Sequence, residues 1–206
     1  MDDLLSPLVS GVLAGLAVAM PLGPIGTLVF DRGARLGFHH GAAAGLGVAT
    51  ADGLYALLAA AAGSALAAPL AAVQDTLRLF AGLALLAIVA YGLITYLRHR
   101  DGTREPVDVP AGRTYLVFLG LTAINPLTVS IFAALIAGLP DVAGAGPGAK
   151  AVFVAGAFAA SAAWQTSLAG AGAALGSRLP PSARASTTVG GYAIVLALAL
   201  RMLLAG

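Results

Sequence analysis

Six long stretches of this chain carry almost no formal charge, and each is long enough to cross a bilayer. They are residues 4–30, 38–68, 79–97, 114–140, 151–177 and 185–204. A helix needs roughly 20 apolar residues to span a hydrocarbon core about 30 Å thick. Backbone amides in lipid must be bonded within their own segment, so these stretches should be helices. We therefore predict an all-α integral membrane protein with six transmembrane helices.

The composition supports the same class. The chain of 206 residues is 59% hydrophobic and only 10% charged, with a mean hydropathy of +0.93. A soluble domain usually carries about 25% charged residues, so a soluble enzyme and a disordered chain are both excluded. The absence of cysteine excludes disulfides and thiolate metal sites. With a net charge of +2 and scattered bases, no nucleic-acid partner is expected. We expect one membrane domain over 1–206, with the lipid bilayer around it.

The basic residues predict an orientation. Eight bases lie toward one side of the six predicted spans, and three lie toward the other side. The first group is Arg32, Arg35, Arg98, Arg100, Arg104, Arg113, Arg178 and Arg184, and the second is Arg78, Lys150 and Arg201. The positive-inside rule places the larger group in the cytoplasm. Both termini are therefore expected on the extracytoplasmic side.

Two of the predicted spans contain helix breakers. Pro21 and Pro24 flank Gly23 inside the first span, and Asn125-Pro126 lies inside the fourth, with Pro21 and Pro126 separated by 105 residues. Each proline removes an amide donor and favours extended geometry in the residue before it. Three spans separate the two breaks, so the halves would insert with opposite orientation. This predicts an inverted 3+3 repeat, about 1–100 and about 110–206, with broken helices one and four. The alternative is that the prolines only kink two helices.

One acid lies inside the core of a predicted span. Burying the carboxyl of Asp52 in a membrane is costly, and such groups usually face a cavity and have a function. Asp52 could couple transport to a proton gradient, or it could balance the charge of a substrate ammonium. The structural alternative is a neutral Asp52 that is hydrogen bonded to a neighbouring helix.

Other polar residues in the spans are weaker candidates. Asn125 could cap a half-helix, while Trp164 and Gln165 could line a cavity or pack in the core. Four hydroxyl side chains are expected to bond backbone carbonyls: Thr50, Ser161, Thr166 and Ser167. The small-residue ladder Gly33, Gly37, Gly41 and Gly45, and the pair Gly172 and Gly176, are interpreted as helix packing.

Enzyme classes find no support in the sequence. There is no HExxH motif, no nucleophile elbow and no P-loop, and a single intramembrane aspartate cannot form an aspartic dyad. We expect no catalytic residues, no metal site and no resident cofactor. The energy source would be a gradient of protons or another ion.

The residues taken together resemble the LysE/RhtB amino-acid exporters. The resemblance rests on 21–24 (PLGP), 31–37 (DRGARLG), Asp52, Asn125-Pro126 and, as in the lysine-exporter branch, 155–161 with Trp164. It implies six helices in a bacterial-type inner membrane, export of a small-molecule substrate, antiport with protons, and a homodimer. The site residues would be Pro21, Gly23, Pro24, Asp52, Asn125, Pro126, Trp164 and Gln165.

The resemblance leaves the substrate open between a basic and a small neutral amino acid. Ile25-Gly26 stands where family members carry a polar pair, and no acid follows Asn125-Pro126 within the next few residues. The alternatives are an exporter of an inorganic cation and a membrane assembly subunit that transports nothing.

Overall fold

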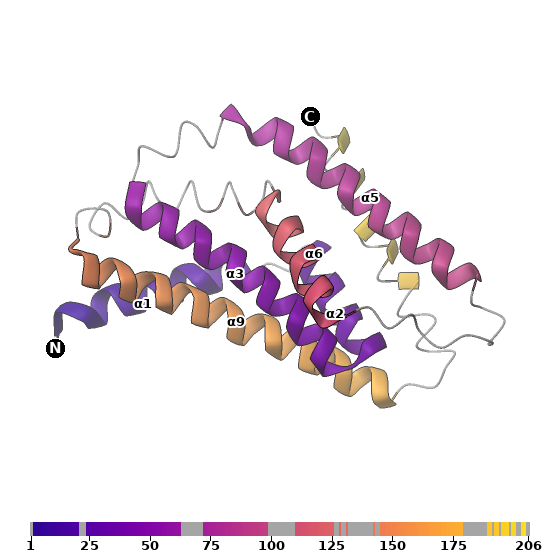
Figure 1. Cartoon of the computed structure of the whole chain (residues 1–206), viewed down its shortest axis with the longest axis horizontal. Coiled ribbons are helices and arrows are strands. Elements are labelled where there is room, and N and C mark those ends of the chain that lie inside the picture. Colours follow the sequence, from indigo (N-terminus) through magenta and orange to yellow (C-terminus); the bar gives the residue numbers. More distant parts are fainter. Residues whose placement is uncertain are drawn as a thin grey trace.

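Every regular element that the structure describes is an α-helix, as predicted. The computed structural model describes residues 2–20, 24–62, 72–98, 110–125 and 145–178, with 128, 131, 142, 189–190, 192–193, 195–197, 199–200 and 203–204. The helices are α1 (Asp2–Ala19), α2 (Pro24–Leu36), α3 (Phe38–Ala62), α5 (Gln74–Arg98), α6 (Ala111–Ala123) and α9 (Pro147–Arg178). In Figure 1, α1 and α9 run along one edge, and α5 runs along the opposite edge.

The first predicted span is broken where the prolines predict it. α1 ends at Ala19, α2 begins at Pro24, and the two helices are bent by 81° relative to each other. Pro24 is the first residue of α2, where its missing N–H costs no intrahelical bond. A second change of direction follows at Gly37, whose φ of 83° suits glycine, between the end of α2 and the start of α3.

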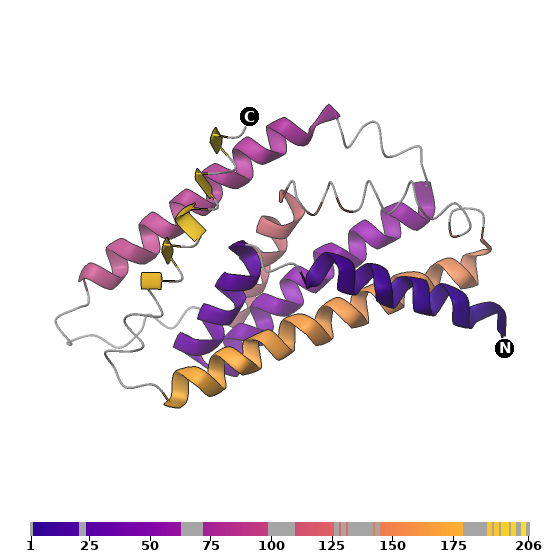
Figure 2. The ribbon, with the colours of Figure 1, turned by 180° about the vertical axis from the view of Figure 1, so that it is seen from behind.

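Helix α9 packs against both parts of the broken span. Four glycine contacts mark the register, and the two residues of each pair are 142 apart in number: Gly11 and Phe153, Gly15 and Ala157, Phe30 and Gly172, Ala34 and Gly176. In each pair a Cβ added to the glycine would overlap a backbone carbonyl, so only glycine permits the approach. Because the offset is constant, α1 and α2 run in the same direction as α9. Figure 2 shows α1 and α2 lying along α9 from the other side.

Helix α3 lies antiparallel to α9 and parallel to α6. Its glycines Gly41, Gly45 and Gly53 lie against Ala169, Gln165 and Phe158 of α9. Toward α6, Gly47 lies against the Tyr115 carbonyl, and the Tyr55 hydroxyl bonds the Ala123 carbonyl, so both pairs are 68 apart. These directions are the ones that alternating spans require. Of the predicted glycine ladder, Gly33, Gly41 and Gly45 do pack against other residues, whereas Gly37 forms the turn and has no neighbour within 4 Å of an added Cβ.

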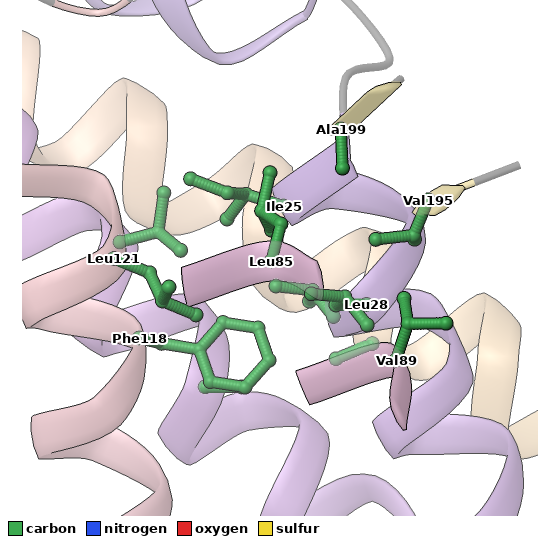
Figure 3. Packing of buried hydrophobic residues seen from close by; sticks show 12 residues of the cluster. Ile25, Leu28, Leu85, Val89, Phe118, Leu121, Val195 and Ala199 are labelled. Carbon is green, nitrogen blue, oxygen red and sulfur yellow. The ribbon is translucent and has the colours of Figure 1, made fainter. Parts of the chain in front are cut away.

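Two apolar clusters lie along this bundle. The larger one joins Ile25 and Leu28 of α2 with Phe118 and Leu121 of α6, and it extends through Leu85 and Val89 of α5 to Val195 and Ala199 (Figure 3). The smaller one joins α1, α3 and α9 and consists of Ala14, Ala56, Ala59, Ala60, Phe153 and Ala157. At the end of α2, Arg35 donates to the Tyr192 hydroxyl at 2.8 Å and lies 3.6 Å from the Asp31 carboxylate.

Two described helices are long and apolar enough to cross a membrane, over Phe38–Ala61 and Pro147–Gly176. The bent pair Leu4–Ala19 and Pro24–Leu36 makes a third candidate if it is counted as one span. α5 contains the shorter apolar helix Gly82–Tyr91. Predicted spans 114–140 and 185–204 fall partly outside the described residues.

Candidate functional site

The carboxyl of Asp52 lies inside the bundle between α3 and α9. Asp52 is 1% exposed. The hydroxyl of Ser161, a fully buried residue on α9, donates to Asp52 Oδ2 at 2.6 Å. Among the described residues, Asp52 Oδ1 has no hydrogen-bond partner. One carboxyl oxygen is therefore held by α9, and the other is a buried acceptor that no described residue satisfies.

Gln165 and Trp164 lie on the adjoining turn of α9. Gln165 is 3% exposed, and its Cβ packs against Gly45 of α3. Within the described part of the chain, Gln165 Oε1 and Trp164 Nε1 are buried and unbonded. Helical side chains lean toward the N-terminus of their own helix. In this antiparallel pair, Asp52 therefore leans toward the level of Gln165, and Gln165 leans toward the level of Ser161.

The helix break lies at the level of this pair. Because α1 and α2 share one register with α9, Ala19 at the end of α1 corresponds to Ser161, and Pro24 at the start of α2 corresponds to Thr166. The first span is thus interrupted over the same stretch of α9 that carries Ser161, Trp164 and Gln165. A helix end leaves backbone N–H and C=O groups without intrahelical partners. The end of α1 and the start of α2 place both kinds of group at this level.

The end of α6 lies about one turn farther along α3. Tyr55, three residues after Asp52, donates its hydroxyl to the Ala123 carbonyl at 2.6 Å. α6 ends at Ala123, and the Asn125 N–H donates to the Thr122 carbonyl at 3.1 Å. The helix thus ends directly before Asn125-Pro126, and Tyr55 bonds one of its last carbonyls.

The structure brings several of the sequence-predicted residues to one level of the bundle. Asp52 and Gln165 lie on facing stretches of α3 and α9, and Pro24 and Asn125 mark helix ends nearby. Trp164 lies directly before Gln165, on the same turn of α9. Pro21, Gly23 and Pro126 lie outside the described residues.

One site residue was misjudged from the sequence. The Ser161 hydroxyl was expected to bond a backbone carbonyl, but it bonds Asp52 instead. Thr166 and Ser167 do bond carbonyls of their own helix, and Thr50 bonds the Leu46 carbonyl. A usable signal was present, because Ser161 and Gln165 are four residues apart and so share a helix face.

The buried acceptor atoms that have no partner among the described residues determine what this site can bind. Asp52 Oδ1 and Gln165 Oε1 are acceptors, and a carboxyl can also exchange a proton. Such a pair suits a group with several N–H donors. Within the described residues, no group of three His, Asp or Glu side chains could hold a metal ion.

Comparison with known sequences identifies the family. A sequence model of the LysE type translocator family matches residues 16–206. The chain belongs to this family. Its members are multi-pass membrane proteins and translocators rather than enzymes, which agrees with the resemblance seen in the sequence.

The chain is similar to a protein from Bacillus subtilis (strain 168) named "Putative amino acid efflux protein YcgF". The two are 32% identical over 128 residues, which is 58% of this chain and 57% of the relative. The match therefore spans little more than half the length of that relative. No solved structure matches the chain.

Proposed function

We propose that this chain is a secondary transporter that exports an amino acid, basic or small neutral, or a similar small metabolite. Export would run by alternating access across a bacterial-type inner membrane, in exchange for protons or another ion. The observation that carries the proposal is the buried Asp52 carboxyl, whose Oδ1 lies unbonded among the described residues at the level of the break in the first span. The family and the efflux relative support the same direction of transport.

The inverted 3+3 repeat, which is proposed to carry out alternating access, is supported by the helix registers. A shift of 105 residues, the separation of Pro21 and Pro126, relates the two proposed repeats. Under this shift, span one corresponds to span four and span five corresponds to span two. Residues that pair 142 apart between spans one and five should then have counterparts that pair 68 apart between spans two and four. The contacts of α3 with α6 have this offset, at Gly47 with Tyr115 and at Tyr55 with Ala123. The shift of 105 residues was taken from the two prolines alone, so these helix contacts support it independently.

The mechanism follows from competition for one carboxyl. The substrate ammonium binds ionised Asp52 through Oδ1, and Gln165 Oε1 accepts a further N–H. The substrate carboxylate lies toward backbone N–H groups at the start of a half-helix, where the helix dipole favours an anion. A proton that enters from outside neutralises Asp52 and releases the amine. Rocking of one repeat against the other then exposes the site to the opposite side.

Reconstituted vesicles test this function. Purified protein in vesicles preloaded with one unlabelled amino acid should accumulate the labelled form by counterflow, and an inward proton gradient should accelerate export. Basic and small neutral amino acids form separate arms of the assay, and divalent cations form a third. Transport of the cations alone would favour an inorganic-ion exporter. No transport in any arm would favour an assembly subunit and overturn the proposal.

The orientation is tested by labelling single cysteines in the cysteine-free chain. With both termini extracytoplasmic, a cysteine replacing Ser6 should react with an impermeant thiol reagent added to whole cells, and one replacing Thr103 should not. The reverse pattern would invert the topology. The proposed homodimer is checked separately by light scattering of the protein in detergent.

A further inference from the structure

We infer that Ser161 is a positioning residue for the Asp52 carboxyl, so that Oδ1 alone faces the substrate or the proton. The inference rests on the proposed function. It assigns a specific task to a serine for which the sequence predicts only a bond to a backbone carbonyl.

The geometry is that of a fixed carboxyl. Ser161 is 0% exposed and Asp52 1%, and the 2.6 Å between Ser161 Oγ and Asp52 Oδ2 is the short distance of a charge-assisted hydrogen bond. The Ser161 hydroxyl can donate to Oδ2 of the ionised carboxylate, and it can keep donating to Oδ2 when a proton binds Oδ1. Ser161 can therefore stay bonded through both states of the cycle, while Oδ1, which has no partner among the described residues, can bind a ligand.

The repeat provides an internal comparison. The shift of 105 residues that relates the two halves takes Asp52 to Ala157 and takes Ser161 to Ala56. Ala56 and Ala157 are both 0% exposed and belong to one apolar cluster. Two alanines thus fill the equivalent contact between α3 and α9. Helix packing at this kind of contact therefore does not require a hydroxyl. We attribute the hydroxyl of Ser161 to its hydrogen bond with Asp52.

Orientation of the carboxyl matters because a second buried acceptor lies on the same helix as Ser161. Gln165 lies one turn along α9, with its Oε1 buried and unbonded among the described residues. When Ser161 holds Oδ2, Oδ1 and Gln165 Oε1 act as two acceptors for one ammonium. When Ser161 is removed, the carboxyl can rotate and the two acceptors lose their fixed separation.

The test compares Ser161→Ala with Ser167→Ala. Ser167 is exposed on the same helix and bonds only the backbone of its own helix in the described contacts, at the Ala163 carbonyl. In vesicle counterflow, we expect Ser161→Ala to raise the apparent KM about tenfold or more, with a smaller change in maximal rate, because a hydrogen bond to a charged group is lost. Ser161→Thr keeps the hydroxyl and should restore part of the affinity. Ser167→Ala should transport like the wild type.

A spectroscopic readout separates this inference from the proposed function. The infrared band of the Asp52 carboxyl is identified by its loss in Asp52→Asn. It should shift in Ser161→Ala and stay in place in Ser167→Ala, whether or not the protein transports amino acids. An unshifted band, or a KM for Ser161→Ala equal to that of Ser167→Ala, would overturn the role of Ser161. Failure of the wild-type protein in every transport arm, with a shifted band, would overturn the function only.

Discussion

Two neighbouring turns of the contact between α3 and α9 differ sharply in chemistry. At one turn Asp52 meets Ser161, and unbonded polar atoms lie nearby within the described residues. At the next turn Ala56 and Ala157 are closed into an apolar cluster with Ala14 of α1 and Phe153 of α9. Both turns are buried to the same degree, so burial alone does not explain the difference.

The extent of α1 explains the difference between the two turns. α1 packs over the apolar turn through Ala14 and Gly15, but it ends at Ala19, which corresponds in register to Ser161. A continuous helix covers its neighbours with side chains and has no free backbone groups to offer. Beyond Ala19, helix ends supply such groups. Polar side chains therefore occur where the cover of α1 stops, which is where a polar solute could be bound.

The largest expected effect is at the polar turn. Asp52→Asn keeps the shape of the side chain but removes its charge and its proton exchange. Gradient-driven export in vesicles should fall about a hundredfold or more, since the buried partner of the ammonium is gone. The residual rate should lose its dependence on pH, and the unfolding midpoint in detergent should not fall. Asp75→Asn, at the exposed start of α5, is the control. Wild-type export with unchanged pH dependence would make Asp52 a structural residue.

The apolar turn should respond in stability instead. Ala56→Leu forces extra volume into a position that is 0% exposed and should lower the free energy of unfolding by about 1–3 kcal/mol. Thermal unfolding in detergent, followed by circular dichroism, measures the loss. Ala61→Leu makes the same change at an exposed position of α3 and should leave the midpoint unchanged. Equal midpoints for the two variants would show that the apolar turn is not tightly packed.

A smaller effect is expected from the bond that joins the polar turn to the end of α6. Tyr55→Phe removes the hydroxyl that donates to the Ala123 carbonyl and should cost about 0.5–1.5 kcal/mol of folding free energy. The same thermal assay applies, with Tyr91→Phe as control because Tyr91 is 70% exposed. If both variants unfold at the wild-type temperature, the Tyr55 contact does not stabilise the end of α6.

The smallest effect is expected at the end of the bundle, outside both turns. Tyr192→Phe removes the acceptor of the 2.8 Å bond from Arg35 but keeps the ring, which lies 5.8 Å from the guanidinium carbon. A solvent-accessible contact of this kind contributes at most about 1 kcal/mol. The change in unfolding midpoint should therefore be smaller than for Tyr55→Phe, in the same detergent and buffer. A larger change would place a main stabilising contact at this end.

The local features of the molecule could be predicted from the sequence, and the pairings could not. The prolines at 21 and 24 determine a break within their own span, and the hydropathy around Asp52 predicts its burial. Both predictions need only nearby residues. The contact of Ser161 with Asp52 joins residues 109 apart, and nothing in either segment names the other. The packing partners of Gly11 and Gly15 on α9 could not be predicted either, because small residues allow close packing without specifying the partner.

The shared register of α1 and α2 on α9 has a consequence for insertions and deletions. Surface loops usually tolerate changes of length, because their ends are not tied to a common repeat. Here Gly11 and Gly15 on one side of the break, and Phe30 and Ala34 on the other, meet α9 at the same offset of 142. One residue added between Ala19 and Pro24 would have to be absorbed within this connection, because otherwise it would displace the contacts of α2 with Gly172 and Gly176. The length of this short connection should therefore be held constant in evolution even where its residues change.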